Sequence, residues 1–487
     1  MSVKDIIKTA TLKELSKGLK NKDFTSTELT EAYLERAKSL NKGTAAYVTL
    51  CEDSAMEDAK KADALIADGK ESALTGIPFG IKDNLCTKDV KTTCASKMLS
   101  DFAPIYDATA VKHLKNQGVV ILGKTNMDEF AMGGSSGTSY FGAVKNPYDL
   151  ERVPGGSSGG SAAAVSASMC AAALGSDTGG SIRQPASFCG ITGLKPTYGT
   201  VSRFGLVAFA SSFDQIGPMA KSAEDCAIIL NAIAGRDEYD STCRIEKTHD
   251  YTSLMGKGVK DLVIGLPKEF FGDDIDASVK TAVFAAAETY KQMGAKIVEV
   301  SLPDLKYAVA AYYLISSAEA ASNLSRFDGI KYGYRSEKGK TYEELIKNTR
   351  REGFGEEVKR RIMLGNYALS SGYYDAYYNK AVKVRKKIKS EFDEIFKTCN
   401  LIITPTAPTT AYKSGSREND PVKMYCADIC TVTANIAGLP ALSTTCGYDE
   451  DGLPIGMSLV GKAYNEETII SAAYEFEKIF ERREAAL

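Results

Sequence analysis

Short apolar runs alternate with helical patterns along most of this sequence. Runs at residues 262–266 and 297–302 have the length of strands, and residues 277–293 between them have the pattern of a helix. Residues 77–81 and 119–122 are further runs of this kind. A strand, a helix and a second strand in succession are typical of a parallel sheet with crossover helices. We therefore expect an α/β protein whose largely parallel sheet has helices on both faces.

Two helix-rich segments interrupt this alternation. Residues 1–70 contain a capping box at Thr25 and Glu28, and residues 304–396 are again rich in helical patterns. No repeat or low-complexity linker separates these segments from the rest of the sequence. We therefore expect one domain over residues 1–487, with an N-terminal helical segment at 1–70 and a helical excursion at 304–396.

The charge balance predicts no overall attraction to nucleic acid or to anionic lipid. Sixty basic and 62 acidic residues leave a formal net charge of −2. Lysines between Lys380 and Lys389 could form a tRNA-facing patch, but the solvated face of an amphipathic helix is the simpler interpretation. The least polar run, residues 162–175, is too short to span a bilayer, so no membrane contact is expected. Eleven scattered cysteines without a Cys-x-x-Cys pair, and an N-terminus unlike a secretory signal, favour a cytoplasmic location.

Histidine is almost absent, and this limits the available chemistry. His113 and His249 are the only two in the sequence, and we interpret both as surface residues. A histidine-rich metal site cannot be built from them, and no metal is expected. If the chain is a hydrolase, we expect its general base to be a residue other than histidine.

Residues 133–205 hold an unusual density of glycine and serine. A first cluster runs from Gly155 to Ser161 and precedes small residues at 162–174 that we interpret as a helix. A glycine-rich loop that enters a helix can bind phosphate, but Ser161 stands where a Walker A loop needs lysine. A nucleotide-binding protein is therefore a weak alternative.

A second cluster begins at Asp177 and places Ser181 after two glycines. Glycines allow backbone N–H groups to converge on one point, as an oxyanion hole requires. The N–H groups of Thr178, Gly179 and Gly180 are the candidate donors. A tight turn with an incidental serine is the alternative, but two clusters of this composition so close together favour a site.

A single lysine, Lys82, follows the strand predicted at residues 77–81. A lysine at a strand end usually reaches solvent, yet lysine is also one of the few bases that can replace histidine. Burial beside the apolar strand would favour its neutral form. Asp83 should face the other way, because successive side chains of a strand alternate.

Together these three stretches resemble the amidase signature family. Lys82, Ser157 and Ser181 match its catalytic lysine, bridging serine and nucleophilic serine, with separations of 75 and 24 residues that are typical of the family. The resemblance covers nearly the whole chain. It implies a three-layer α/β/α fold with a central mixed, mostly parallel sheet, and amide hydrolysis by a Ser-Ser-Lys triad with an oxyanion hole in the second cluster.

Within the family, residues 123–133 and 146–154 most resemble the A subunits of glutamyl-tRNA(Gln)/aspartyl-tRNA(Asn) amidotransferases. This resemblance implies glutamine as the substrate, with contacts from Tyr312, Arg361 and Asp428. Arg361 would pair with the α-carboxylate of glutamine and Asp428 with its α-ammonium group. Four residues differ from those common in these subunits: Gly137, Thr200, Cys430 and Thr433.

The same resemblance implies partners. Such subunits hydrolyse glutamine to glutamate and supply ammonia, which amidates Glu-tRNA(Gln) and possibly Asp-tRNA(Asn). Subunits B and C would be the partners, the partner subunit would bind the misacylated tRNA and use ATP and Mg, and this chain would need no cofactor. The nearest alternative is a stand-alone hydrolase of another small amide, which would not require Arg361 and Asp428. An inactive scaffold of the same fold is disfavoured by the intact Lys82, Ser157 and Ser181.

Overall fold

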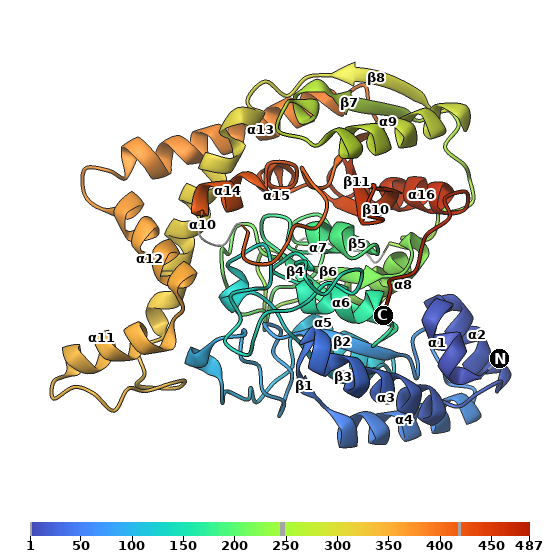
Figure 1. Cartoon of the computed structure of the whole chain (residues 1–487), viewed down its shortest axis with the longest axis horizontal. Coiled ribbons are helices and arrows are strands. Elements are labelled where there is room, and N and C mark those ends of the chain that lie inside the picture. The colour runs from blue at the N-terminus through green and yellow to red at the C-terminus, as the bar shows by residue number, and fades with distance from the viewer. Residues whose placement is uncertain (1, 244–248, 417–419) are drawn as a thin grey trace.

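A computed structural model describes residues 2–243, 249–416 and 420–487. Within these residues a single sheet of eleven strands forms the centre of the molecule (Figure 1). The strands are β1 (Tyr47–Leu50), β2 (Pro78–Lys82), β3 (Val120–Thr125), β4 (Ala172–Asp177), β5 (Thr192–Lys195), β6 (Gln215–Ala220), β7 (Val263–Pro267), β8 (Lys296–Val300), β9 (Leu401–Pro405), β10 (Ala441–Tyr448) and β11 (Pro454–Gly461). Their order across the sheet is β1-β3-β2-β4-β6-β5-β10-β11-β9-β7-β8.

Parallel pairing occurs in two blocks of the sheet, β3-β2-β4 and β9-β7-β8. The strands between these blocks pair antiparallel, as does β1 at the edge. The predicted mixed sheet flanked by helices is confirmed. Among the described strands, however, antiparallel pairs outnumber parallel ones, because loops and a hairpin rather than crossover helices join neighbouring strands in the middle of the sheet.

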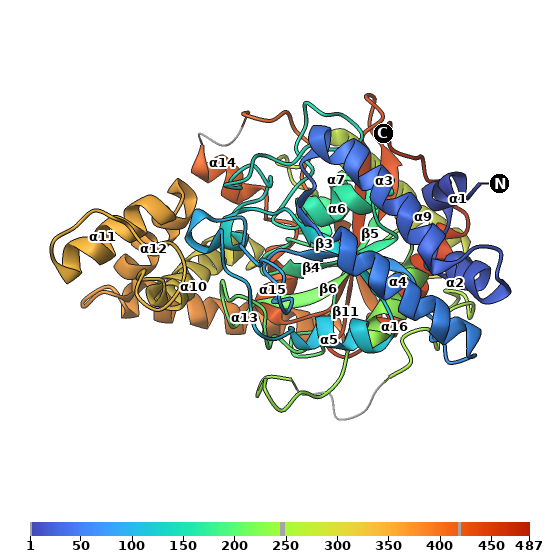
Figure 2. The same cartoon turned by 90° about the horizontal axis from the view of Figure 1, so that it is seen from below.

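Helices cover both faces of this sheet. The helices are α1 (Val3–Thr9), α2 (Leu12–Asn21), α3 (Ser26–Thr44), α4 (Glu52–Ala67), α5 (Thr109–Asn116), α6 (Gly159–Ser166), α7 (Arg183–Phe188), α8 (Ala223–Ile233), α9 (Ala277–Gln292), α10 (Ala308–Asn323), α11 (Tyr342–Gly353), α12 (Glu356–Leu369), α13 (Lys380–Ile395), α14 (Pro421–Cys426), α15 (Val432–Ala437) and α16 (Glu466–Glu477). Figure 2 shows α6 and α7 on one face of the middle strands, and α5 and α16 on the other. No described helix is both long and apolar enough to cross a lipid bilayer.

Helices α10 to α13 occupy the helix-rich stretch at residues 304–396 and project to one side of the sheet (Figure 1). We call these four helices the arm. Helix α10 packs against α12 and α13 within the arm, and it also contacts α15, which lies near the sheet. The arm is therefore connected to the body at the end of the molecule where α15 lies.

Two sequence-based expectations need correction. The sequence predicts one helix over the small residues at 162–174, but α6 ends at Ser166 and the chain continues into β4. The alanine, serine and cysteine side chains there are small and, apart from Ser166, buried, so the sequence contains no periodicity that separates helix from strand. The helical patterns of the first 70 residues also show no sign of β1, which pairs with β3 and lies between α3 and α4 in the chain.

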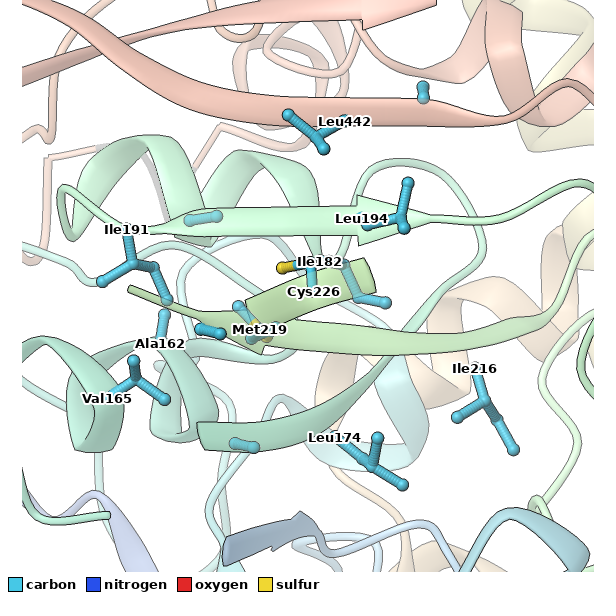
Figure 3. Packing of buried hydrophobic residues seen from close by; sticks show 14 of the residues in the cluster. Ala162, Val165, Leu174, Ile182, Ile191, Leu194, Ile216, Met219, Cys226 and Leu442 are labelled. Atoms are coloured by element: carbon cyan, nitrogen blue, oxygen red, sulfur yellow. The ribbon is translucent and has the colours of Figure 1, made fainter. Parts of the chain in front are cut away.

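Three glycines on adjacent strands make room for one isoleucine side chain. A Cβ added to Gly175 of β4 or Gly193 of β5 would lie 2.9 Å from an atom of Ile182, and one added to Gly217 of β6 would lie 3.0 Å away. Figure 3 shows Ile182 between the strands that carry Leu194 and Met219. Because a close-packed interior tolerates no such overlap, the glycines let Ile182 anchor the loop after β4 onto the sheet.

Candidate active site

Lys82 ends β2 with its side chain fully buried. Its Nζ lies 2.8 Å from Ser157 Oγ, 2.9 Å from Ser176 Oγ and 3.2 Å from the Ser176 carbonyl oxygen. Burial lowers the pKa of Lys82 to about 7, although Asp128 and Asp177 act in the opposite direction. A neutral Nζ can donate to Ser176 and accept a proton from Ser157, so this lysine is suited to act as a base.

Asp83, the neighbour of Lys82, faces away from it, as strand alternation predicts. Its carboxylate accepts hydrogen bonds from the Thr93 hydroxyl and, at 3.1 Å, from the Thr93 N–H. On the same side, its Oδ1 lies 3.8 Å from Nζ of the buried Lys124. The negative charge of Asp83 is therefore directed at a different lysine.

Ser157 lies in the first glycine-rich cluster, after a cis peptide bond from Gly156. Side-chain and main-chain atoms of neighbouring segments lie close to the glycines of this loop. A Cβ added to Gly156 would collide with Asp128 Oδ2, and one added to Gly155 would lie 2.5 Å from Gln184 Oε1. The glycines of the first cluster are therefore required for close approach, which places Ser157 Oγ against Lys82.

Ser181 lies next to this loop, because its carbonyl oxygen accepts a 3.1 Å hydrogen bond from the Ser158 N–H. It is 8% exposed, whereas Lys82 and Ser157 are fully buried. Its Oγ makes no hydrogen bond among the described residues, so it remains available to a ligand. The three residues predicted for the triad are thus brought together, with Ser181 outermost.

Asp177 shapes the loop that carries Ser181. Its carboxylate accepts the N–H of Gly180 at 2.8 Å, the Nε of Arg183 at 3.0 Å and the side-chain amide of Asn435 at 2.8 Å. Arg183 lowers the pKa of Asp177 to about 2 against the raising effect of burial. The N–H of Gly180, predicted as an oxyanion donor, is therefore directed at Asp177.

Two further N–H groups, on either side of Gly180, are candidate donors of the oxyanion hole. The N–H groups of Gly179 and Ser181 make no hydrogen bond within the described part of the chain, and both residues line the pocket described below. The Thr178 hydroxyl donates to Asp214 at 2.6 Å. The hydroxyl of Thr431, which precedes α15, donates to the Gly179 carbonyl oxygen at 2.7 Å and so fixes the orientation of this peptide.

A narrow pocket with a cavity volume of about 10 Å³ opens over Ser181. This volume is about that of one water molecule, so the side chains around the pocket lie close together in this structure. All three predicted substrate residues line it: Tyr312 of α10, Arg361 of α12 and Asp428, which follows α14. Its other lining residues include Ala131, Gly133, Gly179, Phe209 and Tyr313.

The pocket offers one fixed positive charge and one negative charge. Arg361 is only 2% exposed, and its guanidinium lies 4.4 Å from the centre of the Tyr313 ring, within range of a cation–π contact. Asp428 is partly buried and accepts the Tyr313 hydroxyl at 2.5 Å. Burial raises the pKa of Asp428 to about 7, against the lowering effects of Tyr313 and Arg361.

Several residues of the site were not found by sequence analysis. Glu357 accepts a 2.6 Å hydrogen bond from Arg361 Nε, and the hydroxyl of Tyr425 donates to the same carboxylate oxygen at 3.0 Å. The four-residue spacing of Glu357 and Arg361 on a helix was a signal that could have revealed the first contact. Ser176 and Tyr313 gave no such local signal, because their roles depend on contacts with distant segments.

Neither a metal site nor a histidine accompanies these residues in the described part of the chain. No cluster of three His, Cys, Asp or Glu side chains that could hold a metal occurs within the described ranges, and neither histidine lines the pocket. Four residues that depart from the amidotransferase pattern make no hydrogen bond, within these ranges, to Lys82, Ser157 or Ser181: Gly137, Thr200, Cys430 and Thr433.

Comparison with known proteins agrees with this geometry. The Amidase family model matches residues 28–470. The glutamyl-tRNA(Gln) amidotransferase A subunit of Ruminiclostridium cellulolyticum is 56% identical over 471 residues, which span 96% of this chain and 97% of the relative. The crystal structure of the A subunit of the same name from Thermotoga maritima has a TM-score of 0.80 at 40% identity, covering 100% of this chain and 98% of its own. The peptide amidase of Stenotrophomonas maltophilia has a TM-score of 0.82 at 30% identity and 98% coverage of both chains.

Proposed function

The chain belongs to the amidase family, and we propose that it is the glutaminase subunit of a tRNA-dependent amidotransferase. The observation that carries this proposal is the pocket over Ser181. It combines a hydroxyl adjacent to a buried lysine–serine pair with one cationic and one anionic side chain, Arg361 and Asp428. Free glutamine presents the complementary pair of charges and a side-chain amide. The names of the relatives support the same assignment.

The proposed acylation uses Lys82, Ser157 and Ser181. Ser181 Oγ attacks the side-chain carbonyl carbon of glutamine, and its proton passes through the Ser157 hydroxyl to neutral Lys82. The carbon–nitrogen bond then breaks as the proton returns through Ser157 to the leaving nitrogen. Ammonia departs, and a glutamyl ester on Ser181 remains.

Deacylation repeats these proton movements with water. Water attacks the ester carbonyl carbon and gives a proton to Lys82 through Ser157. The Ser181 oxygen then recovers a proton as glutamate leaves. The N–H groups of Gly179 and Ser181 are our choice of oxyanion donors, with Thr178 as a further candidate, because Gly180 already donates to Asp177.

The lowered pKa of Lys82 supports this relay quantitatively. A lysine with a pKa of about 10.4 is neutral only about once in 2,500 molecules at pH 7. A pKa of about 7 makes about half of the molecules neutral. The lowered pKa reduces the free-energy cost of forming neutral Lys82 at pH 7 by roughly 4.6 kcal/mol. This is a substantial part of the barrier reduction that an enzyme must supply.

Substrate selection follows from the two charges. Arg361 pairs with the α-carboxylate of glutamine, Asp428 with its α-ammonium group, and Tyr312 contacts the substrate beside Gly179. A hydrolase of uncharged amides would have no use for the two opposite charges that Arg361 and Asp428 present to the pocket.

In the proposed complex, subunits B and C are the partners of this chain. The ammonia that it releases amidates Glu-tRNA(Gln), and also Asp-tRNA(Asn) where the complex serves both. The partner binds the misacylated tRNA and uses ATP and Mg, whereas this chain needs no cofactor. A cytoplasmic location is part of the same proposal, because the complex would act on tRNA.

Co-purification from native extract, followed by a glutaminase assay, tests the proposal. Two further subunits should travel with the chain, and the complex should convert glutamine to glutamate and, with ATP, amidate Glu-tRNA(Gln). A chain that purifies alone and hydrolyses uncharged amides faster than glutamine would overturn it. That result would support a stand-alone amidase, the second candidate, which the structural likeness to a peptide amidase favours.

A further inference from the structure

Glu357 and Arg361 lie one turn apart on the inward face of α12. Arg361 Nε donates to Glu357 Oε1 at 2.6 Å, and the side chains are 3% and 6% exposed for arginine and glutamate, respectively. A buried, charge-assisted hydrogen bond of this length holds the guanidinium in one orientation. With Nε bound to Glu357, the two terminal nitrogens form the edge of the guanidinium that is left for the pocket.

The same carboxylate connects the arm to the segment that carries Asp428. The Tyr425 hydroxyl donates to Glu357 Oε1 at 3.0 Å. The Tyr425 ring stacks on Tyr313, with ring centres 3.9 Å apart, and the Tyr313 hydroxyl donates to Asp428. Glu357 is therefore linked both to the cationic residue of the pocket and, through two tyrosines, to the anionic one.

Two opposite charges in one small pocket attract each other, and this arrangement keeps them from pairing. Arg361 and Asp428 line the same narrow space, and each stabilises the charge of the other. An arginine free to rotate would pair with Asp428 and neutralise the pocket before substrate arrives. A second carboxylate behind Arg361 competes for its Nε and holds the terminal nitrogens in place.

We propose that Glu357 is a positioning residue. It directs the two terminal nitrogens of Arg361 toward the α-carboxylate of the substrate and keeps Arg361 apart from Asp428. This inference rests on the proposed glutaminase function. It makes Glu357 a determinant of selectivity for α-amino acid amides, although Glu357 itself contacts no substrate.

The test compares Glu357→Gln with Glu356→Gln in the assembled complex. Glu356 is the exposed neighbour on α12 and pairs only with Lys359 among the described residues, so its substitution is a matched control. Glu357→Gln should raise KM for glutamine about 10- to 100-fold while kcat changes less than about threefold, because the charge-assisted hydrogen bond from Arg361 is lost on the binding side only. Arg360, which also pairs with Glu357, does not line the pocket. Hydrolysis of butyramide, which has neither α-charge, should be unchanged in both variants.

A double-mutant cycle separates positioning from general damage. If Glu357 acts through Arg361, Glu357→Gln should add less than about twofold to the loss already caused by Arg361→Ala. Fully additive losses, an equal loss for butyramide, or an unchanged KM for glutamine would each overturn the inference. Should Glu357→Gln fail to fold, Tyr425→Phe replaces it, with a smaller rise in KM expected and no rise contradicting the inference. A parent complex without glutaminase activity would instead reject the proposed function.

Discussion

The two sides of the pocket are built in different ways. Lys82, Ser157 and Ser181, which we call the relay side, come from the end of a central strand and two tight glycine-rich loops packed on the sheet. Arg361 and Asp428, which we call the charged side, come from the arm and from the segment before α15. Chemistry thus rests on the central sheet and the loops packed on it, and recognition rests on the arm and the segment before α15.

Burial disfavours the charged form on both sides, so it shifts the two pKa values in opposite directions. On the relay side it lowers the pKa of Lys82 to about 7, and on the charged side it raises the pKa of Asp428 to about 7. The relay requires the uncharged lysine, whereas recognition requires the charged carboxylate. Both working forms are therefore lost in the same direction, as pH falls.

Replacement of the nucleophile should have the largest effect. Ser181→Ala should lower the rate of glutamine hydrolysis by roughly 10⁴-fold or more, because no ester can form. A glutamine-derived electrophile should label Ser181 in the parent and leave the variant unlabelled, as peptide mass spectrometry can verify. Ser166→Ala, a substitution at the end of α6, is the control and should behave as the parent. A label on Ser157 or on a cysteine would contradict the assignment.

Lys82→Arg should be almost as severe. Arginine keeps its proton near neutral pH, so the relay loses its base, and a loss of about 10²- to 10⁴-fold in kcat is expected for every amide substrate. Circular dichroism should show an intact fold. Lys88→Arg, at an exposed position a few residues further on, should leave the rate unchanged. Near-normal turnover in Lys82→Arg would remove lysine from the relay.

Changes on the charged side should be selective for the substrate. Arg361→Ala and Asp428→Ala should each lower kcat/KM for glutamine about 30- to 5,000-fold, corresponding to about 2–5 kcal/mol for a lost charge partner. Butyramide should be hydrolysed almost as well by these variants as by the parent, and Arg351→Ala on α11 provides the matched control. Full glutamine efficiency in both variants would exclude these residues from the substrate pocket.

The pH profile should separate the two sides within one enzyme. Below pH 7, protonation of Lys82 lowers kcat/KM for butyramide by up to about tenfold per pH unit. For glutamine, protonation of Asp428 adds a second loss, so the slope should approach about hundredfold per unit. Stopped assays between pH 5 and 8 give both slopes. Identical slopes for the two substrates would show that Asp428 does not bind the α-ammonium group of glutamine.

The smallest effect concerns the packing under the nucleophile loop. Gly175→Ala brings a methyl group within 2.9 Å of Ile182 and of Met219, so the free energy of unfolding should fall by about 1–3 kcal/mol. Urea denaturation measures this change. Gly43→Ala, where an added Cβ meets no atom within 4 Å, should leave stability equal or slightly higher. Equal stability in the two variants would mean that Ile182 does not anchor the loop.

The features that could be predicted from the sequence follow the same division between the relay side and the charged side. Lys82, Ser157 and Ser181 could be predicted because each lies in a short stretch whose composition carries its own signal, and the apolar runs of β2, β3, β7 and β8 did so as well. Strand β4 escaped because its buried alanines have no periodicity. Tyr425 was missed because its role arises only when α12 meets a segment far along the chain, whereas Glu357 had a local signal in its four-residue spacing from Arg361. Local patterns therefore predict the chemistry better than the recognition.

The hydrogen bonds from Thr431 and Asn435 to the nucleophile loop also join segments that are synthesised at different times. These residues follow Gly179 and Asp177 by 252 and 258 positions. A ribosome adds roughly 5–20 residues per second, so the loop emerges about 13–50 s before its supports. During that interval every residue of the relay has been synthesised, but the nucleophile loop lacks these two hydrogen bonds. The loop gains them only when synthesis of the subunit is nearly complete.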